Sequence, residues 1–172
     1  MQKLNAVGDR ISWGVERFLI VALAFMVIII FTQVILRVLT NIGLLNTSIP
    51  WGEESARYVM IYMVYFGAVL GVQRGSHIAI TIIDSLLPKF GQRLLHIFAY
   101  LLSLVFFTIL IVFGYEIMMS TMPQTSPALN VRMGLIYAAL PISGALMFFY
   151  TVGNILKEIA SYRNVAKESA NE

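Results

Sequence analysis

The chain has 172 residues, of which 59% are hydrophobic and only 12% are charged, and no water-facing surface of this size tolerates that balance. It contains no cysteine, which excludes disulfides, thiolate metal sites and cysteine nucleophiles. Its formal net charge is +3, but the basic residues stand at the ends of apolar runs, which is typical of membrane topology rather than of nucleic-acid binding. We therefore predict an all-α integral membrane protein with no enzymatic activity and no nucleic-acid partner.

The first of four predicted membrane-spanning helices covers residues 18–37. A bilayer core needs about 20 apolar residues in a helix, and residues 18–36 supply them with only a threonine and a glutamine as polar interruptions. Residues 4–17 ahead of it carry apolar side chains at helical spacing among polar neighbours, with Trp13 alongside. We predict that residues 4–17 form an amphipathic segment at the membrane interface, anchored by Trp13.

A second span is predicted at residues 51–73. Pro50 suits the first turn of a helix, and the carboxylates of Glu53 and Glu54 complement the positive end of the helix dipole. The uncharged part of the span, residues 58–72, would cover only about 22 Å. The charged first turns must therefore lie at the lipid headgroups or against protein.

Residues 77–87 form a shorter apolar stretch after the second span. It is too short to cross a bilayer and ends before Pro88. His77 and Asp84 lie about two helical turns apart and would mark one polar stripe on it. We predict a second segment along the interface, with His77 and Asp84 as anchors in contact with solvated headgroups.

The third and fourth spans are predicted at residues 94–115 and 133–156, joined by a loop rich in proline, serine and threonine. The fourth contains Pro141, which has no backbone N–H to offer the carbonyl of Tyr137. The sequence leaves two uses open for that carbonyl: a packing kink that a neighbouring group satisfies, or an oxygen that coordinates an ion.

The distribution of lysine and arginine predicts which side of the membrane each end occupies. Nine of these residues fall on the side that holds both termini and three on the other side, so both termini are predicted to be cytoplasmic. The nine are Lys3, Arg10, Arg17, Arg74, Lys89, Arg93, Lys157, Arg163 and Lys167, and the three are Arg37, Arg57 and Arg132.

Three glycines spaced by four residues, Gly67, Gly71 and Gly75, lie on one face of the second span. Small residues at this spacing let another backbone approach closely in a membrane. The sequence leaves open whether this face packs within the chain or against another subunit.

A charged cluster opens the second span and consists of Trp51, Glu53, Glu54 and Arg57, with Arg37 at the nearby end of the first span. Glu53 and Arg57 have the i,i+4 spacing that allows pairing, so we predict a structural ion-pair network on the outer side. The functional alternative is a substrate or cation site, and this would require the groups to converge at depth in a water-lined cavity.

Several short motifs occur in an order that is similar to one family. Together they resemble the small membrane subunit (DctQ-like) of tripartite ATP-independent periplasmic transporters, the TRAP family, over nearly the whole chain. The motifs are Arg37, Trp51-x-Glu53-Glu54-x-x-Arg57, Gly67-Ala68, Arg74-Gly75-x-His77-Ile78, Asp84, Ser126-Pro127-Ala128-Leu129, and Tyr137 with Pro141-Ile142.

The resemblance implies a complex of three proteins in a bacterial inner membrane: this subunit, a large many-span permease subunit, and a periplasmic substrate-binding protein that captures an organic acid anion. It also implies symport driven by a sodium gradient through the large subunit, with the small subunit as a non-catalytic scaffold surrounded by membrane lipids. The charged cluster would then help to dock the periplasmic protein. Sialic acid, dicarboxylates and other organic acids all remain open as substrates.

The main alternative is an autonomous homo-oligomeric carrier or channel that uses Glu54 as its coupling carboxylate. A haem protein or a membrane-embedded enzyme is disfavoured, because the two histidines, His77 and His96, both fall on the cytoplasmic side. We therefore expect no bound cofactor and no metal site.

Overall fold

The computed structural model describes residues 2–44, 50–74 and 89–168. Four stretches in its helices are long and apolar enough to cross a membrane, which confirms the predicted all-α fold with four helices of spanning length. The helices are α1 (Gln2–Asn41), α2 (Pro50–Gln73), α4 (Lys89–Thr121), α5 (Met133–Tyr137) and α6 (Ala139–Glu168). The spanning stretches are Gly8–Asn41, Pro50–Gln73, Leu95–Thr121 and Met133–Leu156.

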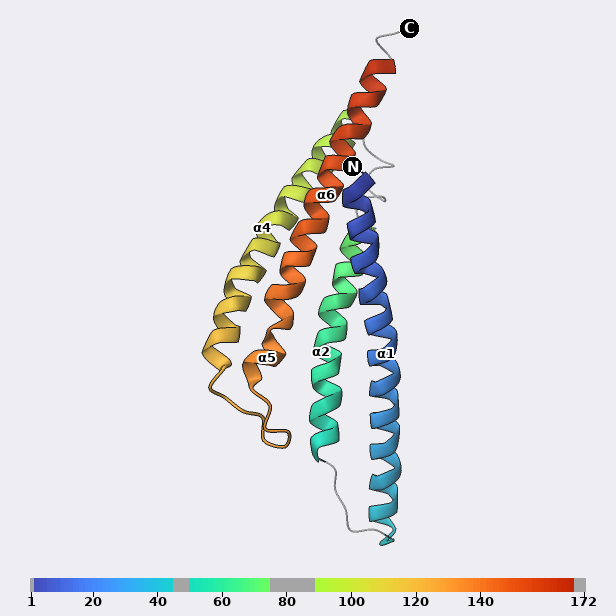
Figure 1. The fold of residues 1–172 in the computed structure, drawn as a ribbon, viewed down its shortest axis with the longest axis vertical. Coiled ribbons are helices and arrows are strands. Elements are labelled where there is room, and N and C mark those ends of the chain that lie inside the picture. Colours follow the sequence, from blue (N-terminus) through green and yellow to red (C-terminus); the bar gives the residue numbers. More distant parts are fainter. Residues whose placement is uncertain (1, 45–49, 75–88, 169–172) are drawn as a thin grey trace.

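The helices lie side by side rather than around a common axis. α4 packs on α6, α6 packs on α2 and α2 packs on α1, so the order across Figure 1 is α4, α6, α2, α1. The beginning of α1 and the end of α6 lie at the same end of the molecule, and we call this the inner end (Figure 1). The outer end holds the start of α2 and the connection between α4 and α5.

α1 is one continuous helix of 40 residues, about 60 Å long. The predicted interfacial segment 4–17 and the predicted span 18–37 are therefore two parts of the same helix, because the side chains change from polar to apolar without a proline to interrupt the backbone. In the first part, Val15 is buried and Ile11 packs against the protein core, so its apolar side meets other helices. That residues 4–17 lie at the membrane interface stays a prediction.

The apolar core lies toward the inner end, where four helices meet. It contains Val69 of α2, Phe107 of α4, and Met147 and Tyr150 of α6, with Ile11 of α1 packed against them. Val69 has no exposed surface at all. Because lipid chains are as apolar as these side chains, close van der Waals packing rather than exclusion of water holds this core together.

The backbone of α4 lies close to the backbones of α5 and α6, and glycines occupy this contact, which we call the seam. A Cβ atom added at Gly134 would lie 2.5 Å from the carbonyl oxygen of Met118, and one at Gly114 would lie 3.1 Å from the backbone nitrogen of Pro141. A methyl group at Gly134 would force its neighbours to move, and one at Gly114 would be in unusually tight contact, so glycine favours the close approach of the two backbones.

The fourth spanning stretch is interrupted at Ala138, where α5 ends and α6 begins. Pro141 lies one turn later; its ring removes the N–H that would bond to the carbonyl of Tyr137 and crowds that carbonyl. The helical backbone hydrogen bonds resume after the proline, where the amide of Ile142 donates to the carbonyl of Ala138 at 3.3 Å.

Gly75, His77 and Asp84, and with them the predicted interfacial segment 77–87, lie outside the described residues. Their roles stay predictions.

Candidate functional site

One face of α2 holds the outer connection between α4 and α5. Glu54 directs its carboxylate at this connection: Oε1 accepts a hydrogen bond from the amide of Ala128 and Oε2 one from the amide of Leu129, each at 3.1 Å. Charged acceptors make the stronger class of hydrogen bond to backbone N–H groups. Both oxygens of Glu54 are therefore engaged in fixing a loop.

Two tyrosines continue this face of α2 at intervals of four residues. The hydroxyl of Tyr58 donates to the Sδ atom of Met133 at 3.7 Å, and that of Tyr62 donates to the backbone carbonyl of Leu135 at 2.6 Å. The Tyr62 ring also stacks on Phe66 of its own helix, with centroids 6.0 Å apart. We call Glu54, Tyr58 and Tyr62 the outer clasp, because together they join α2 to α5 and its preceding loop.

The loop that the outer clasp holds has a defined backbone. The amide of Ser126 donates to the carbonyl of Val131 at 2.9 Å, and the amide of Asn130 donates back to the carbonyl of Ser126 at 3.1 Å. Asn130 has a φ of 52°, in the left-handed region that asparagine tolerates better than most residues. The hydroxyl of Ser126 is buried and lies beside the Glu54 carboxylate.

The structure does not bring the predicted outer charged network together. Among the described residues, no ion pair joins Glu53 to Arg57, and both side chains are exposed. Arg37 and Trp51 are exposed as well. Within the described part of the cluster, Glu54 accepts hydrogen bonds from backbone amides, and Arg57 is the cation near enough to act on its charge. The predicted docking role of the cluster stays a prediction.

A contact that sequence reasoning missed lies within the same motif. Gly52 is buried beneath the side chain of Gln33, and a Cβ added there would lie 2.7 Å from the Nε2 atom. In the sequence, Gln33 is only a polar interruption of the first predicted span. A polar residue within an otherwise apolar helix can indicate a contact with another helix, and this was the one sign of the contact in the sequence.

The glycine face of α2 has no partner within the described part of the chain. A Cβ added at Gly67 or Gly71 would meet nothing within 4 Å, and Gly71 is exposed together with Ala68 and Val64 on the same side. Within the described residues, no other helix packs against Gly67 and Gly71, and a partner for this face stays a prediction.

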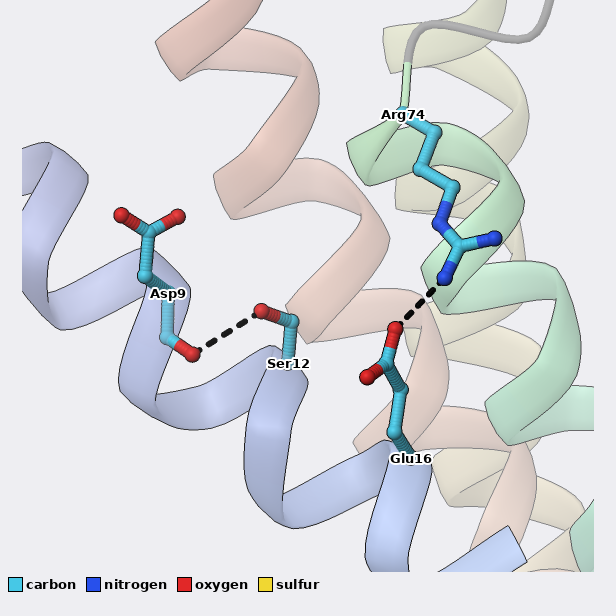
Figure 2. A network of polar contacts seen from close by, with 4 residues as sticks. All are labelled: Asp9, Ser12, Glu16 and Arg74. Atoms are coloured by element: carbon cyan, nitrogen blue, oxygen red, sulfur yellow. Dashed lines mark hydrogen bonds and ion pairs between the residues drawn. The ribbon is translucent and has the colours of Figure 1, made fainter.

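The inner end is joined by a second set of polar contacts, which we call the inner clasp. Arg74 at the end of α2 pairs with Glu16 of α1 at 2.5 Å, one turn along from Ser12, whose hydroxyl donates to the carbonyl of Asp9 (Figure 2). The hydroxyl of Tyr150 donates to the carbonyl of Gly8 at 2.9 Å.

Asn154 of α6 completes the inner clasp by donating to the carbonyl of Val72 at 3.1 Å. This carbonyl belongs to the last turn of α2, where carbonyls lack partners in their own helix. Sequence reasoning did not predict the inner clasp, because its partners lie far apart along the chain.

The described polar side chains do not form a metal-binding group. Within the described residues, no group of three histidine, aspartate or glutamate side chains lies close enough to hold a metal ion. Polar side chains instead join α2 to its neighbours at both of its ends, and Tyr150 joins α6 to α1, while the side of α2 at Gly67 and Gly71 stays open within the described residues.

Comparison with known proteins agrees with this architecture. Residues 26–161 match the family model of the DctQ component of tripartite ATP-independent periplasmic transporters. A Haemophilus influenzae protein assigned to the TRAP transporter small permeases is 28% identical over 156 residues, covering 91% of this chain and 94% of that protein.

Two further relatives carry substrate names. The sialic acid TRAP transporter small permease SiaQ of Vibrio cholerae is 29% identical over 106 residues, 62% of this chain and 61% of that protein. The isethionate TRAP transporter permease DctMQ of Oleidesulfovibrio alaskensis is 31% identical over 99 residues, 56% of this chain and 16% of that protein. Because the family model matches most of the chain, and four helices are long and apolar enough to span a membrane, this protein belongs to the DctQ family as a multi-pass subunit of a TRAP transporter.

Proposed function

We propose that this chain is the scaffold subunit of a sodium-driven TRAP transporter, bound beside a large permease subunit that carries the substrate. A periplasmic binding protein delivers an organic acid anion to the complex. The chain itself takes no part in translocation but widens the part of the complex that stays fixed in the bilayer.

The open glycine face of α2 is the observation that carries this proposal. Gly67 and Gly71 have nothing within 4 Å of an added Cβ, whereas Gly114 and Gly134 in the seam have backbone within 3.1 Å. Small residues in a membrane helix let a second backbone approach closely. A helix of the large permease is the partner we assign to this face.

The relatives support both the partner and the substrate class. The name DctMQ describes a permease in which the stretch similar to this chain makes up only 16% of the protein, as expected if the small and large subunits are fused there. Sialic acid and isethionate, named in two relatives, are both organic acid anions.

The environment of Glu54 favours the scaffold over an autonomous carrier. A coupling carboxylate must bind and release a cation in each cycle, but both oxygens of Glu54 accept backbone hydrogen bonds from Ala128 and Leu129. Releasing them would free two amides of a loop whose fold they stabilise. The polar groups that we name therefore act in assembly.

The test is co-purification of the large permease with a tagged Gly71→Leu variant in mild detergent. Gly153→Leu serves as the matched control, because an added Cβ at Gly153 also meets nothing within 4 Å. We expect Gly71→Leu to lose most of the large subunit and the sodium-driven uptake, while Gly153→Leu keeps both. Intact assembly and uptake in Gly71→Leu would show that this face is not the interface.

A further inference from the structure

The first turns of α1 present two opposite faces. Ser12 and Val15 are buried on one of them, against the protein. Arg10, Trp13 and Arg17 lie on the other at spacings of three and four residues, and all three are exposed. This second face, which we call the basic face, points away from α2 and α6.

The basic face combines a large exposed ring with two cations. Trp13 is 62% exposed, and the guanidinium carbon of Arg17 lies 5.2 Å from the centre of its ring. Such stacking orders the guanidinium while leaving its N–H groups free to bind a planar or tetrahedral anion. Gly14 lies beside them with nothing within 4 Å of an added Cβ, so a ligand can come close to the backbone there.

Within the described part of the chain, the acidic side chains of α1 do not neutralise the basic face. Glu16, the acidic side chain nearest to Arg17 in sequence, is paired with Arg74, the residue that follows α2. The carboxylate of Asp9 lies on the flank of the helix and points away from Arg74 (Figure 2). Arg10 and Arg17 thus offer two positive charges against the one carboxylate of Asp9.

The basic face lies where α1 changes from polar to apolar. Arg17 is the last charged residue before Arg37, and the residues that follow expose large apolar side chains, beginning with Phe18, Ile20 and Val21. Tryptophan and arginine at such a boundary are placed at headgroup level, where a phosphate meets the cation and the ring meets the glycerol region.

We propose that Arg10, Trp13 and Arg17 form a binding site for the phosphate of an anionic phospholipid in the cytoplasmic leaflet. The two arginines bind the headgroup, the Trp13 ring orders Arg17 and packs on the lipid, and the acyl chains run along Phe18 and Val21. This site selects lipids by charge, which an anchor made of apolar and aromatic groups alone would not do.

Fluorescence of Trp13 tests the proposal. The chain contains two tryptophans, so Trp51→Phe leaves Trp13 as the single reporter in the full-length protein. The protein is placed in phosphatidylcholine vesicles with increasing fractions of brominated phosphatidylglycerol or, separately, brominated phosphatidylcholine. Bromine quenches the ring only at short range, so the two titrations give the relative association constant of the anionic lipid.

We expect the anionic lipid to be preferred at least about fivefold, and each of Arg10→Gln and Arg17→Gln to lower that preference by about fivefold or to abolish it. Arg37→Gln is the matched control, since it removes one positive charge from the other end of the same helix; it should leave the preference unchanged. Circular dichroism of every variant checks that the helices are intact.

Equal quenching by the two brominated lipids would overturn the proposal, as would a preference that survives the double Arg10→Gln, Arg17→Gln variant. If that double variant instead loses the co-purified permease while its lipid preference is unchanged, the basic face binds protein and the assignment to lipid is wrong.

Discussion

The seam between α4 and the α5–α6 pair is built differently from the attachment of α2. In the seam, backbones approach so closely that a Cβ at Gly134 would overlap its neighbours and one at Gly114 would be in tight contact. α2 is instead fastened to its neighbours by side-chain hydrogen bonds of the outer and inner clasps. Glycine therefore has two uses among the described residues: it closes the seam at Gly114 and Gly134, and it leaves one side of α2 open at Gly67 and Gly71.

The largest effect should follow from filling the seam. Gly134→Ala places a methyl group 2.5 Å from the carbonyl oxygen of Met118 and 2.7 Å from the Cγ atom of Met122. Such overpacking costs about 1–3 kcal/mol, so the thermal unfolding midpoint of the purified subunit should fall by several degrees. Gly67→Ala, on the open face, should leave that midpoint unchanged; equal behaviour of the two variants would remove the distinction between the regions.

The next effect should come from the outer clasp. Glu54→Ala removes the acceptor for the amides of Ala128 and Leu129, so hydrogen exchange at these two amides should accelerate by at least about tenfold. Glu53→Gln, at an exposed neighbour without an ion pair to Arg57, is the control and should not alter that exchange. Unchanged protection in Glu54→Ala would show that the loop holds its own shape.

Tyr62→Phe should have a smaller effect than either. It deletes the hydrogen bond to the carbonyl of Leu135 and keeps the ring that stacks on Phe66. Side-chain hydrogen bonds between membrane helices contribute about 0.6 kcal/mol on average. The unfolding midpoint should drop slightly in Tyr62→Phe and stay constant in Tyr65→Phe. A drop as large as that of Gly134→Ala would place the hydroxyl among the main determinants of the fold.

The smallest effect is expected at the inner clasp. The side chains of Arg74 and Glu16 are 65% and 43% exposed, and an exposed ion pair contributes at most about 1 kcal/mol. Arg74→Gln should therefore leave the unfolding midpoint almost unchanged in moderate salt. A loss that grows as the salt concentration is lowered would show that the pair does stabilise the end of α2.

Hydropathy was sufficient to predict the four spanning helices, because the length of an apolar run is a local property of the sequence. The interruption at Ala138 is also a local effect. It lies one turn before Pro141, whose missing N–H affects the helix only within four residues. The continuity of α1 was not evident, because a change in polarity is not a change in backbone conformation.

The clasps could not be predicted because their partners are distant in sequence. Glu54 bonds to amides 74 and 75 residues away, and nothing near Glu54 indicates them. The sequence places Tyr58 and Tyr62 in the uncharged part of the second span, although each also carries a hydroxyl donor. For the glycines, the spacing predicts a shared face, but only the surrounding atoms distinguish the closed seam from the open face of α2.

The central claim, that the open face of α2 binds the large permease, can be tested by site-directed cross-linking in native membranes. Because the chain has no cysteine, Ala68→Cys provides a single thiol on the exposed side of this face for a benzophenone maleimide, with Gly153→Cys as the control. The account predicts that illumination links Ala68→Cys, and not Gly153→Cys, to the large permease. Cross-linking of Ala68→Cys to lipid alone, or to a second copy of this chain, would contradict it.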